Sequence, residues 1–417
     1  MRLQTITTAL AVLTAMPTFA GINLLTDDEA ATKALSWNAP SGCSGVPGYF
    51  VVGKSGKFYL GVGGQVKTTI GADFGHPIDD PDEFITSAIP MGDMNGNGAK
   101  FNISARQTSF FLNMLAMPES KDKVGAYVGF NFIDPNYKPT LVYAYLRWRG
   151  LQAGYDYNLF ADPASNPGMI DYEGANSILS LGAASLRWTQ KFDAAGKWTG
   201  AIGMEMPRAS FTDAELLGHE RTAYVSQRVP DIPLAVEYSW AEGSHVRLAG
   251  VVRNLYSRNL IENKNIDRLG WGLHLSYVGE ILPRLTGYAS GWYGRGIASF
   301  CEDLSNGGLD LVPTADGRSV EAIKAWGAYA ALQYSFNEKW SILGCYSHVR
   351  TYADKYDGGA VAWGDQYRYG QYVAANLCYN INDHLSTGIE YIWGRRVNND
   401  GEKAANNRVQ AAFTFNF

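Results

Sequence analysis

Eight basic side chains lie at alternate positions of strand-like segments, where they share one face of each segment. They are Lys67, Arg106, Arg147, Arg187, Lys191, Arg247, Arg253 and Arg408. Fewer acidic residues have the same phase: Asp73, Asp156, Glu205, Glu237 and Glu390. Because the whole chain carries a net charge of −5, this basic excess is specific to the face. Guanidinium groups bind carboxylates through paired hydrogen bonds, so the face predicts binding of small anions.

The same arginines allow a second interpretation, in which each one only pairs with a neighbouring carboxylate of the face. We favour Arg106, Arg147 and Arg187 as selectivity residues because they lie near the connection at residues 161–182. That connection carries three acids: Asp162, Asp171 and Glu173. If it folded inward opposite the arginines, it would produce a transverse electric field. The alternative is an ordinary exposed loop.

Residues that could support catalysis or metal binding do not form a convincing set. The six histidines show no HxxxH or HExxH spacing, and no Ser-His-Asp grouping or phosphate-binding loop stands out. The acidic run at residues 79–83 could hold Ca²⁺ through carboxylate oxygens, but a solvated acidic loop is the simpler interpretation. We therefore expect a protein that is not an enzyme and that has no metal or other cofactor.

The segments that carry the charged face alternate with a period of two. In residues 58–73 the even positions are mostly apolar, and the odd positions are small or polar. At about 3.3 Å per residue this segment is long enough for a tilted membrane-spanning strand. Similar segments follow at 100–114, 123–133, 140–149, 151–160, 183–192, 197–206, 232–240, 244–255, 267–278, 283–295, 323–336, 339–351, 367–380, 384–395 and 407–417. The resulting even count of strands is what a closed bacterial β-barrel requires.

The connections between these segments alternate between short and long. Most of the short ones contain two to four residues, such as those at 193–196 and 241–243. The long ones are at 74–99, 161–182, 207–231, 256–266, 296–322, 352–366 and 396–406. Short periplasmic turns and long extracellular loops are typical of outer-membrane barrels. A soluble sandwich rarely keeps this alternation through so many strands.

Aromatic residues near the strand ends fit the same interpretation, because amphipathic rings prefer the membrane–water boundary. The candidate girdle residues are Trp148, Tyr157, Trp188, Trp198, Trp240, Trp271, Trp326, Trp340 and Trp393. The last segment alternates up to the final residue, Phe417, which carries no polar tail. A terminal Phe on such a strand resembles the signal that outer-membrane assembly machinery reads.

Composition excludes several other classes of protein. The 417 residues include 46 Gly, 25 Tyr and 11 Trp, and only 18% are charged. The hydrophobic fraction of 46% argues against strong disorder. The acidic net charge gives no reason to expect a nucleic-acid partner. Beyond residue 20 no apolar run is long enough for a membrane-spanning helix.

The first twenty residues have the features of a secretory signal peptide. A basic Met1-Arg2 start precedes an apolar stretch at residues 9–16, and Thr18-Phe19-Ala20 offers a cleavage site. We expect a signal peptide at 1–20, a periplasmic segment at 21–56 and a transmembrane barrel at 57–417. Export allows disulfides, and Cys43, Cys301, Cys345 and Cys378 permit three pairings. Cys345 and Cys378 fall on neighbouring predicted strands and are one candidate pair.

Several stretches resemble, in order, the DcaP-like family of trimeric outer-membrane porins. They are residues 105–108, 146–154 (Leu-Arg-Trp-Arg-Gly-Leu-Gln-Ala-Gly), 170–174 (Ile-Asp-Tyr-Glu-Gly), 228–233 (Arg-Val-Pro-Asp-Ile-Pro), 246–250, 390–396 (Glu-Tyr-Ile-Trp-Gly-Arg-Arg) and 400–401. The resemblance spans roughly residues 50–417. Family members can carry an N-terminal coiled coil, whereas residues 21–56 contain no heptads.

The resemblance implies a sixteen-stranded homotrimer in a Gram-negative outer membrane. Its partners would be outer-membrane lipid, small anionic solutes such as dicarboxylates, and the assembly machinery that reads Phe417. The expected function is therefore a passive diffusion channel. Two alternatives remain: a non-conducting barrel that serves as an adhesin or structural protein, and an outer-membrane hydrolase.

Overall fold

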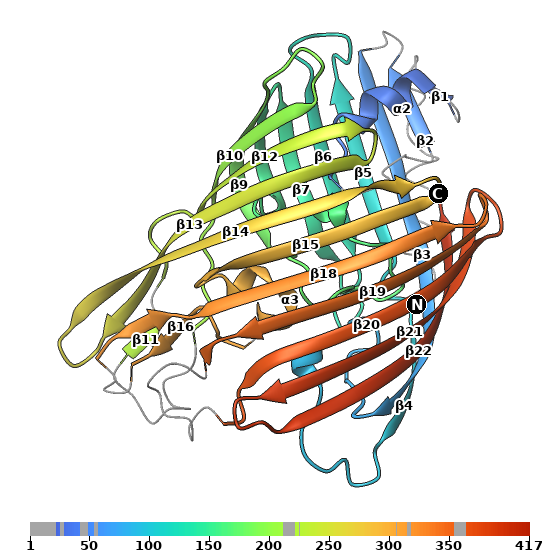
Figure 1. Cartoon of the computed structure of the whole chain (residues 1–417). Coiled ribbons are helices and arrows are strands. Elements are labelled where there is room, and N and C mark those ends of the chain that lie inside the picture. Colours follow the sequence, from blue (N-terminus) through green and yellow to red (C-terminus); the bar gives the residue numbers. More distant parts are fainter. Residues whose placement is uncertain are drawn as a thin grey trace, which may run out of the picture.

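The computed structural model describes residues 22–25, 29–41, 49–53, 57–211, 222–224, 226–305, 307–314, 318–353 and 364–417. These residues form a closed antiparallel β-barrel of sixteen strands (Figure 1). The fold class predicted from the alternation is confirmed. The predicted signal peptide at residues 1–20 lies outside the described residues.

Every predicted segment corresponds to a strand of the barrel wall. The second segment is interrupted at residues 105–108 and forms two strands, both of which pair with β3. The wall consists of β3 (Phe58–Gly75), β4 (Ala99–Ser104), β5 (Ser109–Ala116), β6 (Val124–Asn131), β7 (Thr140–Trp148), β8 (Leu151–Tyr157), β9 (Gly182–Lys191), β10 (Trp198–Glu205), β12 (Ile232–Ala241), β13 (Ser244–Asn259), β14 (Lys264–Leu282), β15 (Leu285–Arg295), β18 (Lys324–Ser335), β19 (Trp340–Thr351), β20 (Tyr367–Asn380), β21 (Leu385–Asn398) and β22 (Lys403–Asn416).

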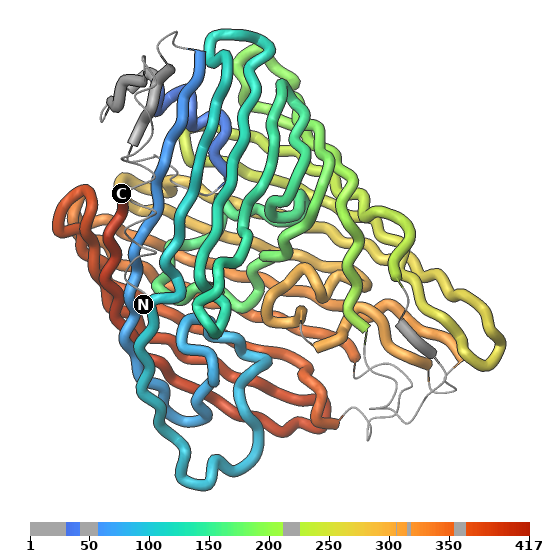
Figure 2. The backbone as a smooth tube through the Cα atoms, turned by 180° about the vertical axis from the view of Figure 1, so that it is seen from behind, coloured from blue at the N-terminus to red at the C-terminus, as the bar shows by residue number. Residues whose placement is uncertain are grey.

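The barrel closes where the last strand meets the first. Strand β22 pairs with β3 from Asn406 opposite Gly75 to Asn416 opposite Gln65. Figure 2 shows blue β3 beside the red C-terminal strands. At the end of the ladder the backbone of Phe417 exchanges two hydrogen bonds with Gly64. The Phe417 ring packs on Phe110 and Phe415, so the terminal residue is part of the barrel seam. Closure leaves the wall without an unpaired edge.

The outer surface of the wall is apolar, as the alternation predicts. Large side chains such as Phe101 and Leu273 are 71% and 55% exposed, because in this fold they face lipid. Near the short turns, outward rings contact one another in the order Trp198, Tyr238, Trp240 and Tyr277. Tyr157 is an exception among the predicted girdle residues. It packs on the buried ring of Tyr143 and lines a cavity inside the barrel.

The N-terminal segment is joined to the short-turn end of the wall. It contains β1 (Ile22–Leu25), α2 (Glu29–Ser36) and β2 (Tyr49–Gly53). Strand β2 pairs with β1 and with the first residues of β3. Just after α2, the Asn38 side chain donates to Asn113 of β5 and to the carbonyl of Ala126 on β6. Arg147 of β7 donates to the carbonyl of Trp37. The segment after α2 is therefore held against the inner face of β5–β7.

Three long loops pack inside the barrel and form most of its core. The first, residues 76–98, contains η1 (Thr86–Ala88), and the second, residues 158–181, contains η2 (Pro163–Ser165). The third, residues 296–323, contains η4 (Ala298–Phe300), α3 (Glu302–Ser305), β16 (Leu311–Pro313) and β17 (Val320–Ala322). A short strand, β11 (Thr222–Tyr224), pairs with the end of β13. Phe160 and Phe300 are fully buried against Trp292 of the wall in the largest hydrophobic cluster. Phe84 of the first loop packs on Tyr372 of β20.

The candidate disulfide between Cys345 and Cys378 is wrong. Both side chains are free thiols, as is Cys301, whereas Cys43 lies outside the described residues. The register places Cys345 opposite Ala374 and Cys378 opposite Ser341. The two Cα atoms are therefore offset by four residues along the ladder, beyond the reach of about 7 Å that a disulfide allows. No helix among the described residues is long and apolar enough to span a membrane.

Candidate functional site: the lumen and its inner loops

The loop at residues 158–181 (the inner loop) lies across the lumen and is bonded to strands on several sides. Near its start, Asp162 contacts β13 and β14. In the middle, the Tyr329 hydroxyl of β18 donates to the carbonyl of Ser165 at 3.0 Å. Towards its end, Trp292 of β15 donates to the carbonyl of Ser177 at 2.8 Å. The inner loop therefore has a fixed position within the barrel.

Asp162 is the first anchor of the inner loop. Its side chain is 3% exposed and meets His245 at 2.9 Å and the hydroxyl of Ser276 at 2.5 Å. The guanidinium of Arg247 lies 3.8 Å away. Burial opposes ionisation, but the hydrogen bond with His245 and the charge of Arg247 outweigh it, so the pKa of Asp162 is well below its usual value. Asp162 is therefore an anion that binds the loop to the wall.

A second anchor joins the inner loop to the opposite side of the wall. Glu390 of β21 accepts the backbone N–H groups of Ile170 and Asp171 at 3.0 and 2.8 Å. Lys67 of β3 donates to the carbonyl of Ile170 at 3.0 Å. Asp171 in turn accepts hydrogen bonds from the Tyr372 hydroxyl and from the backbone N–H of Phe84. This anchor therefore connects the wall, the inner loop and the first loop.

The first loop supplies acids to arginines of the wall. Arg106 is 4% exposed and donates to Asp82 at 2.7 Å and to Asp80. Arg408 binds Asp73 within the wall at 2.6 Å and also donates to the carbonyl of Asp80. The acidic run at residues 79–83 therefore supplies ion-pair partners to the wall and is not the solvated loop that we expected. Among the described residues, no three His, Cys, Asp or Glu side chains are grouped so that they could hold a metal ion.

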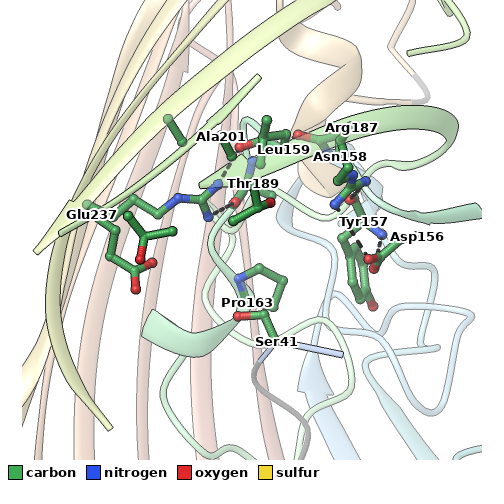
Figure 3. A pocket seen from close by; sticks show the side chains of 14 residues that line it. Ser41, Asp156, Tyr157, Asn158, Leu159, Pro163, Arg187, Thr189, Ala201 and Glu237 are labelled. Carbon is green, nitrogen blue, oxygen red and sulfur yellow. Dashed lines mark hydrogen bonds and ion pairs between the residues drawn. The ribbon is translucent and has the colours of Figure 1, made fainter. Parts of the chain in front are cut away.

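A cavity of about 190 Å³ lies between the inner loop and the wall strands β8–β13 (Figure 3). It carries charges of both signs: Arg187, Arg247, Asp156 and Glu237. Its other lining residues are Ser41, Tyr157, Asn158, Leu159, Ala161, Pro163, Thr189, Thr199, Ala201 and Ala235. In Figure 3 Glu237 lies on one side of the cavity, and Arg187 and Asp156 lie on the other.

The two arginines of the cavity are bound differently. Arg187 lies 3.5 Å from Asp156 and 3.7 Å from Glu205, and it also donates to the carbonyl of Tyr157. Arg247 donates to the carbonyls of Ala161 and Leu159 at 2.5 and 2.6 Å. Carbonyl oxygens satisfy the N–H groups of Arg247 without neutralising its charge. Its nearest acid, Asp162, is shared with His245.

Solved structures of outer-membrane channels share the barrel fold of this chain. The outer membrane channel DcaP of Acinetobacter baumannii superposes with a TM-score of 0.74 at 18% identity, over 88% of this chain and 99% of that chain. The fold is that of an outer-membrane porin. The anion-selective porin from Comamonas acidovorans has a TM-score of 0.52 at 8% identity and covers 87% and 100% of the two chains. OmpF of Salmonella typhi, in complex with daunomycin, has a TM-score of 0.52 at 12% identity, over 86% and 98%.

No family model and no curated protein sequence matches this chain. The resemblance to the DcaP-like family is confirmed through the fold. The porin barrel, with its apolar exterior and aromatic strand ends, is an outer-membrane structure of Gram-negative bacteria, as predicted.

The eight predicted pore-lining cations have different environments in the porin barrel. Arg106, Arg253 and Arg408 are almost completely buried in ion pairs. Lys67 binds the inner loop, and Arg147 binds Gln152 and the segment after α2. Lys191 is exposed at the short-turn end. Of the eight, Arg187 and Arg247 line the cavity.

Sequence reasoning missed the acidic residues outside the strands that pair with the inward-facing arginines. Asp82 pairs with Arg106, and Asp231 and Asp310 pair with Arg253. The count of eight basic against five acidic residues considered strand positions only and therefore overstated the positive charge of the lumen. A signal for one of these partners was visible, because the acidic run at residues 79–83 has no lysine or arginine beside it.

Where the three loops meet, carboxyl groups are buried close together. Burial, with the charges of neighbouring acids, raises the pKa of Glu83 to about 8 and that of Asp171 to about 7. Burial also raises the pKa of Asp303 to about 6, although Tyr367 and Thr86 donate to its carboxylate. Burial and the charge of Asp303 also raise the pKa of Glu173 well above its ordinary value. Neither carboxylate oxygen of Glu173 has a hydrogen-bond partner among the described residues.

These raised pKa values predict that alkaline solution loosens the loop junction. A carboxyl group whose folded pKa is raised stabilises the fold below its unfolded pKa and loses that contribution as the pH rises through the folded pKa. We expect the melting temperature to fall as the pH rises from about 4, the ordinary pKa of a carboxyl group, to about 8, and Glu173→Gln to reduce that fall. Thermal unfolding in detergent at a series of pH values measures the melting temperature. The exposed Glu119→Gln is the matched control, and an equal fall in E173Q and wild type would contradict the prediction.

Proposed function

We propose that the protein is a passive outer-membrane diffusion channel for small hydrophilic solutes, with a preference for anions such as dicarboxylates. The observation that carries the proposal is the cavity beneath the inner loop, with Arg187 and Arg247 in its lining. A polar passage walled by low-dielectric protein concentrates the field of its fixed charges. Two guanidinium groups in one passage would hold the two carboxylates of a small solute in turn or together.

The acids of the cavity make the passage a site of weak binding. Glu237 is the cross-strand partner of Arg247, and Asp156 lies beside Arg187. An anion that binds either guanidinium must compete with the resident carboxylate. Conduction requires a solute to leave as readily as it enters, and this competition favours release. The anion preference therefore rests on Arg187 and Arg247 rather than on Arg106 and Arg147.

Neutralising the two cavity arginines is expected to reverse the preference. In R187Q/R247Q, Asp156 and Glu237 remain as the charges of the cavity, so the reversal potential under a salt gradient should shift towards cation selectivity. The measurement needs low ionic strength, because salt at 0.15 M screens exposed charges within about 8 Å. Lys191→Gln, at the exposed short-turn end, is the matched control and should change the potential little. An unchanged permeability ratio in the double variant would reject the two arginines as the selectivity element.

Planar-bilayer recording of the purified wild-type protein tests the channel itself. Stepwise conductance is the expected result. Correctly folded protein that stays silent would favour the non-conducting alternative, an adhesin or structural barrel, which the dense packing of three loops in the lumen makes a real competitor. A hydrolase would need a nucleophile, a base and an orienting group in mutual reach, and no observation at the cavity favours one.

We further propose that the channel is a homotrimer, and that outer-membrane assembly machinery reads Phe417. The trimer rests on the resemblance to DcaP-like porins, and the role of Phe417 rests on its place at the seam beside Gly64. Native mass spectrometry in mild detergent should give the mass of three chains. A stable single chain would contradict this proposal and would leave the conductance proposal intact.

A further inference from the structure

Four basic side chains form a row on the outside of the barrel, at the ends of strands that lead into long loops. They are Arg295, Lys324, Arg350 and Arg395, which we call the outer cation row. Their outward direction follows from strand phase. Leu332 and Tyr346 share the phase of Lys324 and Arg350 and are 52% and 47% exposed on the lipid-facing surface.

The strand registers place the four residues near one another. Arg295 and Lys324 are direct cross-strand partners. Arg350 pairs with Trp326, two residues along β18, so it is the diagonal neighbour of Lys324. Such positions lie about 5 Å and about 7–8 Å apart at the Cβ atoms. Arg395 lies two strands beyond Arg350, on β21, opposite Gln371 of the intervening β20. The row therefore crosses β15 to β21 on one face.

The outward residues below the row mark the depth of the membrane. On β18 the outward side chains run from Tyr334 and Leu332 through two alanines to Trp326 and then Lys324. On β19, His348 lies below Arg350, and its ring stacks between Trp326 and Tyr369. An apolar stretch, then aromatic rings, then a cation is the order from the hydrocarbon core to the headgroups. The row thus lies at headgroup depth, on the side of the long loops.

Ion pairs within the described part of the chain leave three of the four cations of the row uncompensated. No ion pair among the described residues involves Arg295, Lys324 or Arg395. The Nε of Arg395 is buried without a hydrogen-bond partner in the described part of the chain. All four side chains are half-buried, so their stems lie along the wall while the charged ends reach the interface. Cations held in this way at a membrane surface attract anionic headgroups.

We infer that the outer cation row binds the phosphate groups of a phosphorylated glycolipid in the outer leaflet. Guanidinium groups form paired, charge-assisted hydrogen bonds with phosphate oxygens, and the lysine adds a point charge between Arg295 and Arg350. The acyl chains would lie along the apolar stretch below the aromatic rings. This lipid site is independent of ion conduction by the lumen, since none of its residues lines the cavity.

Native mass spectrometry of the purified protein, mixed in detergent with a diphosphorylated glycolipid, tests the site. The variant is R295Q/K324Q/R350Q/R395Q. Each lost cation should weaken binding about fivefold, so the quadruple variant should retain at least about tenfold less lipid than wild type. The matched control replaces four exposed lysines at the short-turn end, Lys57, Lys121, Lys197 and Lys339, with Gln and should retain lipid as wild type does.

Two further sets of measurements identify the source of the phosphate and exclude a folding defect in the variant. The same glycolipid without its phosphates should bind wild type much more weakly, and excess inorganic phosphate should not displace the intact lipid. Circular dichroism and bilayer conductance of the quadruple variant should match wild type. Equal lipid retention by the quadruple variant, equal binding of the dephosphorylated lipid, or displacement by inorganic phosphate would each overturn the inference.

Discussion

Shortening the inner loop is expected to raise the single-channel conductance severalfold. Replacing residues 163–179 with a short Gly-Ser linker removes η2 and the backbone through Ser177, which Trp292 binds, while Asp162 and its bonds to His245 and Ser276 remain. A wider cross-section should then lie open beside β18–β21. Planar-bilayer recording of the variant and the wild type gives the comparison directly.

The control for this prediction is a loop that lies outside the lumen. The β13–β14 hairpin extends far from the barrel, and its tip at residues 260–263 is exposed (Figure 1). Shortening that tip should leave conductance unchanged. If the inner-loop variant also conducts as the wild type does, the loop is not what limits the passage. A silent wild type with a conducting variant would instead identify the loop as a plug.

The wall could be predicted from the sequence because each strand carries its own signal. In β14 and β19 the phase that holds Leu273 and Ile342 is mostly apolar, because the lipid-facing surface favours apolar side chains away from the strand ends. The alternation depends only on residues that are neighbours in the chain, so it can be recognised without the three-dimensional structure. The interruption of the second strand at residues 105–108 shifted boundaries without changing the count.

The interior could not be predicted in the same way, because its contacts join residues far apart in the chain. Asp303 binds Thr86 across 217 positions, and Asp73 binds Arg408 across 335. Strand phase correctly turned Arg106 inward but gave no information about Asp82 from the first loop. The disulfide prediction failed for a related reason. Neighbouring strands were identified, but the register that separates Cys345 from Cys378 is fixed by the whole ladder.

Removing Arg253 is expected to cause the largest loss of stability of any single substitution. Its side chain is fully buried and lies 3.0 Å from Asp231 and 3.4 Å from Asp310. It also donates to the carbonyl of Gly296 at 2.6 Å and stacks on Phe300. These contacts join β13 to the segment before β12 and to the third loop. Arg253→Met keeps much of the side-chain volume but leaves two buried carboxylates without a cation, which typically costs about 3–5 kcal/mol.

The form of that loss distinguishes an electrostatic cause from a packing defect. Two buried acids without a cation take up protons, so the R253M variant should regain part of its free energy of unfolding as the solution is acidified. The triple variant R253M/D231N/D310N should be more stable than R253M at neutral pH, because no buried charge remains. Urea unfolding in detergent, followed by tryptophan fluorescence, measures both effects. Arg149→Gln, which removes the exposed pair with Asp122, should cost less than about 1 kcal/mol at any pH. If neither acidification nor the D231N and D310N substitutions reverse the loss of stability in R253M, then Arg253 contributes packing against Phe300 rather than charge.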